Sequence, residues 1–242
     1  MGTGFQSFSI QHFSALFTCG LVTYAAIRKG KVSDKYMKSN IALMLAGFTF
    51  SSLVAEAMVK GAEGTYDYLV DLPFFLCDLV AVLLPFILYF KNRKWIGILY
   101  FWALAGTMQA LITPDLQDGF PSFHFFRYFI THAGIVAAVL YTVVVWKIRI
   151  SWKDFFNAIL FSQVYLAFIH IINQVLGSNY SYTMQKPMGP TILDMMGAWP
   201  WYIFWGECLM IALFLLLMVP FLITKDRMEE DPLGDDEWTD NV

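Results

Sequence analysis

A cysteine and an aspartate, Cys77 and Asp78, are adjacent in the apolar segment LPFFLCDLVAVLLPFILYF at residues 72–90. A histidine, His132, lies in a second apolar segment, 123–146. Cysteine attacks carbonyl carbons as its thiolate, and a nearby imidazole can take the thiol proton because it titrates near neutral pH. In such a group Asp78 would orient the histidine and set its tautomer. The residue types therefore allow nucleophilic catalysis by Cys77, His132 and Asp78.

Each of these residues also has a structural interpretation. A buried cysteine commonly acts as a small apolar side chain, and a single histidine inside a membrane can simply join two helices by a hydrogen bond. Asp78 can pair with Arg127, which reduces the cost of burying either charge. Alternatively, Arg127 holds a phosphate or a carboxylate, because its planar guanidinium binds oxyanions through two hydrogen bonds.

Further polar and aromatic residues lie in or beside the apolar segments. His124, Tyr128 and His132 follow one another at intervals of four, so they share one face of a helix. Gln109 and Asn173 are candidate hydrogen-bond donors to an oxyanion. The candidate substrate-binding residues are Gln109, His124, Arg127, Tyr128, His170, Asn173, Asn179, Lys186, Trp199 and Trp201.

Composition and segment length predict the elements that position these residues. The chain has 242 residues, of which 58% are hydrophobic and 14% charged, and its mean hydropathy of +0.56 is typical of a multi-spanning membrane protein. A bilayer core about 30 Å thick requires roughly 20 mainly apolar residues per helix. Such windows occur at residues 10–27, 40–59, 72–90, 95–113, 123–146, 155–176 and 199–223. None alternates polar and apolar residues, so we expect an all-α bundle of seven transmembrane helices.

Basic residues predict the orientation of the chain. Thirteen of the sixteen Lys and Arg follow the first, third, fifth or seventh window, which leaves only Lys60, Arg127 and Lys186 for the other side. Because short cytoplasmic loops are rich in Lys and Arg, the N-terminus is expected outside and the C-terminus inside a multi-pass protein of the cell membrane. The polar candidates then gather near the outer ends of the helices, which predicts a polar cavity open to the outside.

The chain is expected to form one transmembrane domain, residues 1–225. Residues 226–242 hold eight acidic residues and one basic residue, which is typical of a disordered cytoplasmic tail. The external loop 177–198 is long enough to serve as a lid, for which Asn179, Lys186 and Asp194 are candidates.

Spacing argues against several other classes of site. The three cysteines, at positions 19, 77 and 208, all fall inside predicted spans and show no CxxC pattern, and the four histidines show no HExxH pattern. We therefore expect no metal and no other cofactor. Nothing indicates nucleic-acid binding, the expected partners are membrane phospholipids, and the oligomeric state is left open.

Several motifs occur in the order in which a known family has them: LPFFLCDLV, LAGTMQALITPDL, GFPSFHFF, THAGIVAAVLY, LGSNYSYTMQKP and LDMMGAWPWY. Over roughly residues 72–222 the chain resembles the YwaF-like bacterial integral membrane family, which is related to vertebrate transmembrane protein 164. The resemblance implies an acyltransferase that moves fatty acyl chains between phospholipids through a cysteine acyl-thioester. It places the nucleophile at Cys77 and the histidine at His132, and it puts Phe75 where the bacterial pattern has a histidine.

Our hypothesis from the sequence is a membrane acyltransferase, or a hydrolase if water accepts the acyl group, with a site that opens to the outer leaflet. It expects Cys77 and His132 within one hydrogen bond or one bridging water. The alternative is a membrane transporter or binding protein for a small polar solute or lipid, which would use the same cavity without covalent chemistry. A structural subunit, whose polar residues pair only with each other, is a third interpretation.

Overall fold

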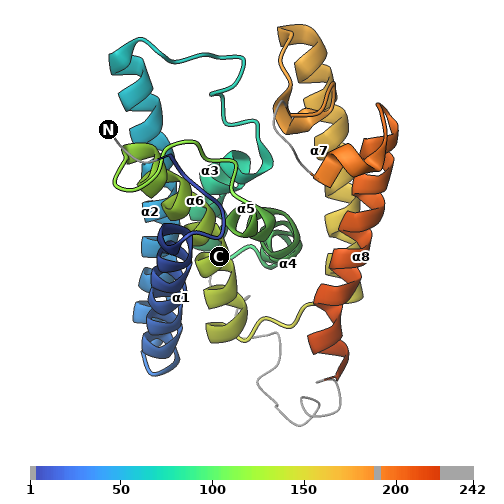
Figure 1. The fold of residues 1–242 in the computed structure, drawn as a ribbon. Coiled ribbons are helices and arrows are strands. Elements are labelled where there is room, and N and C mark those ends of the chain that lie inside the picture. Colours follow the sequence, from blue (N-terminus) through green and yellow to red (C-terminus); the bar gives the residue numbers. More distant parts are fainter. Residues whose placement is uncertain (1–3, 188–191, 224–242) are drawn as a thin grey trace.

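The computed structural model describes residues 4–187 and 192–223, which form an all-helical protein (Figure 1). In chain order the elements are α1 (Ile10–Lys31), α2 (Lys35–Glu63), α3 (Leu76–Tyr89), α4 (Arg93–Phe101), the π-helix η1 (Trp102–Thr107), α5 (Met108–Ile112), α6 (Phe123–Val145), α7 (Trp152–Leu176), the 3-10 turns η2 (Tyr180–Tyr182) and η3 (Ile192–Met196), and α8 (Trp201–Ile223). The described residues form no strand beyond one isolated bridge between Gly4 and Asp118. The expected all-α class is confirmed, whereas the acidic tail 226–242 lies outside the described residues.

Six helices are long and apolar enough to cross a membrane: α1, α2, the continuous helix Arg93–Ile112, α6, α7 and α8. The remaining predicted span, 72–90, gives the 14-residue α3, which is about 21 Å long at 1.5 Å per residue. It is shorter than predicted because Pro73 disfavours a helical conformation at the residue before it and the helix begins only at Leu76. Six or seven helices therefore suit a membrane.

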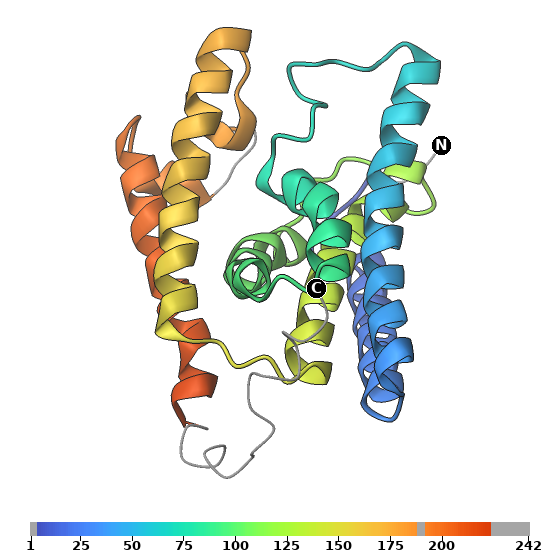
Figure 2. The same ribbon diagram turned by 180° about the vertical axis from the view of Figure 1, so that it is seen from behind.

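The continuous helix 93–112 lies across the other long helices. In Figures 1 and 2, α1, α2, α6, α7 and α8 run lengthwise, whereas α4 and α5 are seen nearly end-on between α6 and the pair formed by α7 and α8. The sequence analysis expected all seven helices to run side by side. We call this element, which comprises α4, η1 and α5, the central helix.

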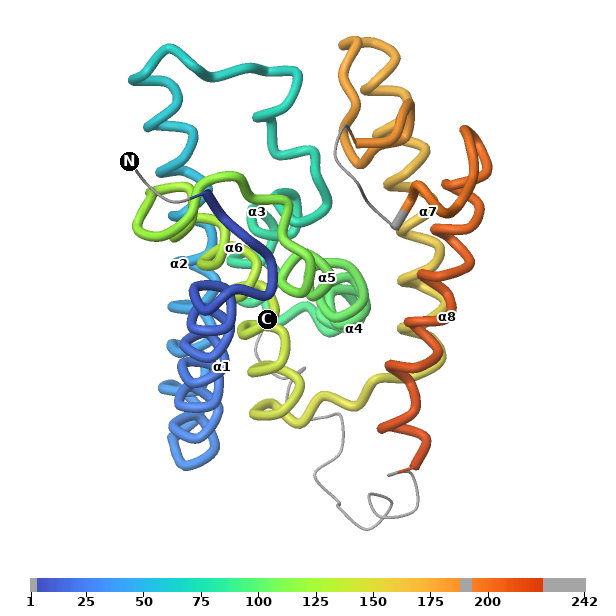
Figure 3. The backbone as a smooth tube through the Cα atoms, in the orientation of Figure 1, coloured from blue at the N-terminus to red at the C-terminus, as the bar shows by residue number. Residues whose placement is uncertain are grey.

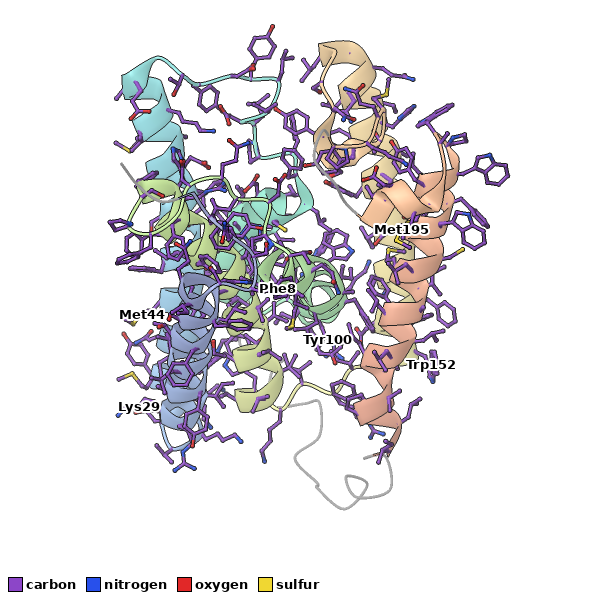
Figure 4. The ribbon with its side chains drawn as sticks, in the orientation of Figure 1. Phe8, Lys29, Met44, Tyr100, Trp152 and Met195 are labelled. Carbon is purple, nitrogen blue, oxygen red and sulfur yellow. The ribbon has the colours of Figure 1, made fainter. Side chains whose placement is uncertain are left out.

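Several connections between helices lie at two opposite ends of the molecule. The backbone trace shows the connections that follow α2 and α7 at one end, and the α1–α2 turn and the 146–151 connection at the other (Figure 3). Lys29 lies near the second end (Figure 4). The basic connections after the first and fifth predicted spans therefore share one end of the molecule.

The central helix contributes much of the apolar core. Ile98 and Phe101 are fully buried against Leu84 of α3 and against Ile135 and Tyr141 of α6. In contrast, α1 and α8 expose large apolar side chains on their outer faces, which suits helices that face lipid rather than water. The protein thus packs its interior around the central helix.

An ion pair fixes the start of the central helix to α7. Arg93 binds both carboxylate oxygens of Asp154, with Nη1 to Oδ1 at 3.0 Å and Nη2 to Oδ2 at 2.9 Å. A side chain at Gly97 would overlap the Asp154 carboxylate, so only glycine allows this approach. Farther along the same helix Tyr100 points into the interior and donates its hydroxyl to the Leu217 carbonyl of α8 at 3.0 Å (Figure 4).

Candidate functional site

The Cys77 thiol lies against the central helix. Cys77 is in the first turn of α3, and its Sγ is 3.5 Å from Oγ1 of Thr107, the last residue of η1. Thr107 is 1% exposed, so water has almost no access to the hydroxyl that the sulfur contacts. Single π-turns inside α-helices are frequent at functional sites. The thiol therefore has a specific polar neighbour that sequence reasoning did not identify.

His132 is held in one tautomer by its own helix. Its Nδ1 lies 2.8 Å from the carbonyl oxygen of Tyr128, one turn earlier in α6. Because a carbonyl only accepts, Nδ1 must carry the proton in the neutral ring, which leaves the lone pair on Nε2. Nε2 has no hydrogen-bond partner among the described residues, and the Tyr128 ring stacks on the imidazole with centroids 4.2 Å apart. In this tautomer the free lone pair of the His132 ring is on Nε2.

Cys77 contacts the central helix directly from α3, whereas His132 of α6 is linked to that helix through the stacked ring of Tyr128. Thr107 contacts the thiol, and three residues later the Ala110 carbonyl accepts a hydrogen bond of 2.9 Å from Tyr128, the residue that stacks on His132. Residues three apart lie on the same face of a helix. Within the described part of the chain no hydrogen bond joins the thiol directly to the imidazole.

Asp78 is paired with Arg127, as the structural interpretation of the two residues predicted. Arg127 Nη2 lies 3.0 Å from Asp78 Oδ1 and 2.5 Å from Glu56 Oε2, and the three side chains are only 15–17% exposed. The expectation that Asp78 sets the histidine tautomer is wrong, because the Tyr128 carbonyl occupies Nδ1 of His132. The carboxylate instead ties α3 to α6 through the guanidinium.

Further charged residues of α2 and of the connection after it line a cavity. Lys60 lies 3.8 Å from Glu56 and 2.5 Å from Asp71, which belongs to the connection between α2 and α3. A cavity of about 190 Å³ is lined by these three side chains together with Tyr66 and apolar residues of α2 and α3. A cavity with a mainly apolar wall and three charged side chains therefore lies beside the ion pairs of Arg127.

Asn173 organises the loop that follows α7. Its Nδ2 donates to the Tyr180 carbonyl and to Thr183 Oγ1, both at 2.8 Å. Its Oδ1 accepts from Ser178 Oγ and from the Tyr180 amide, also at 2.8 Å. Because both amide hydrogens are used, the expectation that Asn173 donates to an oxyanion is wrong. It shapes residues 178–183 instead.

Residues 178–183, which we call the covering segment, pack on the start of α3 beside Cys77. The Tyr180 ring lies 5.4 Å from Phe74 and 5.3 Å from Phe75 between centroids, and its hydroxyl donates to the Tyr68 carbonyl at 2.6 Å. Burial raises the pKa of Tyr180, because a phenolate in this contact would lose its hydration. The covering segment therefore packs through an aromatic side chain on the residues that precede α3.

The residues expected to form the lid bind within the loop itself. Asn179 donates to the Gln185 carbonyl at 2.8 Å. Lys186 lies 3.8 Å from Asp194 and 5.8 Å from the centroid of the Tyr202 ring. These contacts stabilise the loop on the side of α8 and do not reach Cys77.

The other substrate-binding candidates are dispersed. His170 lies 3.4 Å from Thr183 Oγ1 through Nδ1, and Trp199 donates to the Thr183 carbonyl at 3.1 Å, so both brace the covering segment. Trp201 is 61% exposed. Gln109 is exposed, and its side chain has no hydrogen-bond partner among the described residues. The ring of His124 packs edge-on against Phe123, 5.7 Å away. None of these residues contacts the thiol.

Two residues near the thiol escaped the sequence analysis. Thr107 is the only Ser or Thr between positions 93 and 112, a signal that the periodicity of a regular helix does not reveal. Tyr165 of α7 donates to the Phe74 carbonyl at 2.9 Å, just before α3, and also bonds the Ser181 hydroxyl of the covering segment. Tyr165 lies in an apolar stretch of the sequence, so nothing there distinguished it from residues that only pack in the core.

Comparison with known proteins places the chain in a family. An uncharacterized protein of Treponema pallidum (strain Nichols) is 30% identical over 120 residues, which are 49% of this chain and 49% of that protein, so the similarity spans about half of each. No solved structure matches the chain significantly. The sequence model described as the TMEM164 family matches residues 7–218, which extends the resemblance seen in the motifs to include α1 and α2. The chain therefore belongs to the TMEM164 family.

Proposed function

We propose that this chain is an integral membrane acyltransferase that moves fatty acyl chains between phospholipids through an acyl-thioester on Cys77. The observation that carries the proposal is the state of His132: its Nδ1 lies 2.8 Å from the Tyr128 carbonyl oxygen, so the lone pair of the neutral ring is on Nε2. The Tyr128 ring that stacks on this imidazole bonds the central helix at Ala110, three residues after the Thr107 that Cys77 contacts. The motif resemblance, which implies acyl transfer through a cysteine, supports the same chemistry.

The proposed reaction has two halves. In the first, Nε2 of His132 takes the proton of the Cys77 thiol, the sulfur bonds to the carbonyl carbon of a lipid ester, and the ester C–O bond breaks. The departing lysolipid oxygen takes the proton from His132. In the second, His132 takes a proton from the hydroxyl of a different lysolipid, whose oxygen displaces the sulfur and restores the thiol. Water in place of that hydroxyl gives hydrolysis, and neither half needs a cofactor.

The cavity between α2 and α3 combines an apolar wall with a few charged groups, which suits a lipid substrate. The cavity of about 190 Å³ beside α2 and α3 has room and charge for part of a polar headgroup, with Lys60 and Tyr66 in its wall. Arg127 would act by holding α2, α3 and α6 together rather than by binding the headgroup, since its guanidinium already binds Glu56 and Asp78. The basic connections at the opposite end favour an orientation in which the site opens to the outer leaflet.

One experiment tests this proposal. The purified protein and its Cys77→Ser and His132→Ala variants, in nanodiscs, are incubated with a phospholipid labelled in its acyl chain and an unlabelled lysolipid. We expect label transfer by the wild type and none by either variant, whereas Cys208→Ser, which alters an exposed cysteine of α8, retains transfer. Mass spectrometry should detect the acyl group on Cys77. A wild type that shows neither exchange nor thioester would refute the proposal and favour a binding or transport protein.

A further inference from the structure

Thr107 uses its hydroxyl differently from most threonines in these helices. Threonine inside a helix commonly bonds the carbonyl three or four residues earlier. Such bonds, between 2.8 and 3.1 Å long, are made by Thr18, Thr23, Thr49, Thr113 and Thr142. Among the described residues the only hydrogen-bond partner of the Thr107 hydroxyl is Cys77 Sγ. The Thr107 hydroxyl therefore bonds the sulfur of Cys77 instead of a carbonyl of its own helix.

The π-helix explains this difference. At the end of η1 the Met108 amide donates to the Ala103 carbonyl, five residues earlier, so the turn is wider than an α-turn. At the start of η1, Trp102 donates its indole N–H to Ser162 of α7 at 2.9 Å. Side chains at the two ends of η1 therefore bind α7 and α3, which fixes the rotation of the segment that carries Thr107.

The other hydroxyls around Cys77 are not available to the sulfur. Tyr128 bonds the central helix three residues after Thr107, and Tyr165 bonds the backbone three residues before Cys77. Tyr128 donates its proton to the Ala110 carbonyl at 2.9 Å, and Tyr165 donates to the Phe74 carbonyl at 2.9 Å. A hydroxyl has one proton to give. Of the hydroxyl groups in the described chain, Thr107 is thus the one that can donate to Cys77.

We infer that Thr107 is a positioning residue for Cys77, whose hydroxyl donates to the sulfur and stabilises the thiolate. In the neutral pair either atom can be the donor, but once the sulfur has lost its proton only Thr107 can donate. A hydrogen bond to a charged acceptor that water does not reach is among the stronger ones in a protein. The use of this thiolate in acyl transfer rests on the proposed function, whereas the hydrogen bond can be tested without any lipid substrate.

The test measures how fast the Cys77 thiol reacts. In a Cys19→Ala, Cys208→Ala background the remaining cysteine is Cys77, and a small methanethiosulfonate reagent reports its reactivity between pH 6 and pH 10. We expect Thr107→Val to slow the reaction about tenfold at neutral pH, because one hydrogen bond to a charged group is lost. Thr107→Ser should stay within about twofold of the parent, since it keeps the hydroxyl. The matched control is Thr142→Val, which removes a buried hydroxyl that bonds only its own helix.

Several outcomes would overturn the inference: Thr107→Val as fast as the parent, Thr107→Ser as slow as Thr107→Val, or a parent thiol that does not react at all. If Thr107→Val does not fold, Thr107→Ala serves as the second variant without a donor. Acyl exchange measured on the same proteins separates the two ideas. A slower thiosulfonate reaction with no exchange in any protein supports the role of Thr107 and refutes the proposed function. If exchange and the thiosulfonate reaction are both unaffected in Thr107→Val, the role of Thr107 alone is refuted.

Discussion

Replacement of Arg127 tests how the charges around α3 are balanced. The guanidinium binds Glu56 at 2.5 Å and Asp78 at 3.0 Å, and all three side chains are at most 17% exposed. In Arg127→Met, Glu56 still has Lys60 at 3.8 Å, but the ion pair of Asp78 is lost. One orphaned carboxylate at this depth is expected to lower the free energy of unfolding by about 3 kcal/mol, the lower end of the range for a broken buried pair. That is about a hundredfold in the folding equilibrium constant.

The measurement is unfolding in mixed micelles by titration with sodium dodecyl sulfate, followed by tryptophan fluorescence. Asp78→Asn in the Arg127→Met background should recover at least half of the loss, because the uncompensated charge is then gone. The control is Arg28→Met, which removes an exposed arginine at the end of α1. A loss below about 1 kcal/mol in Arg127→Met, or a further loss on adding Asp78→Asn, would contradict the reasoning.

Three further predictions concern the covering segment and the central helix. Asn173→Ala removes four hydrogen bonds that hold residues 178–183, so amide hydrogen exchange there should accelerate at least about tenfold. Asn173→Asp keeps an oxygen that can accept from Ser178 and from the Tyr180 amide, so its exchange rate should lie between those of Asn173→Ala and the wild type. Asp154→Asn should lower the free energy of unfolding by about 2 kcal/mol in the same titration, and Arg93→Lys should be destabilised too, because an ammonium cannot bind both carboxylate oxygens as the guanidinium does. The stabilisation from Tyr180 packing should be fully present below the ordinary tyrosine pKa of about 10 and should be lost as the pH rises through the raised pKa of Tyr180, because only the neutral phenol is stable in its buried position. Hydrogen exchange of the covering segment at alkaline pH measures this loss. Tyr180→Phe should abolish the pH dependence.

The sequence predicted the helices better than their directions. Apolar segments longer than about 18 residues, bounded by charge, correspond to α1, α2, α6, α7 and α8. Hydropathy reports that a segment avoids water but says nothing about the axis along which it lies, so the crosswise path of the central helix could not be predicted. That path depends on specific contacts, such as the Arg93–Asp154 pair, between residues 61 positions apart.

In the candidate site, too, the contacts that follow from residue types could be predicted, whereas those that depend on tertiary or local backbone geometry could not. Pairing of Asp78 with Arg127 followed from the cost of burying an isolated charge, which is a property of the residue types alone. The tautomer of His132 depends instead on whether a carboxylate or a backbone carbonyl reaches Nδ1 first, and its own helix supplied the carbonyl. Asn173 was misassigned because its amide is consumed by a loop seven to ten residues away, a local closure that helical spacing does not reveal.

The central helix is attached to α7 through Arg93 and Trp102 and to the opposite side of the molecule through the neighbours of Thr107 and Ala110. It therefore links two groups of lipid-facing helices, as a crossbar links two posts. A bilayer of different thickness changes the tilt that such helices prefer, at a cost of a fraction of a kcal/mol per ångström of mismatch. Any change of tilt of α7 relative to α6 must turn or bend the crossbar, so the environment of the Cys77 sulfur should vary with the length of the surrounding lipid chains.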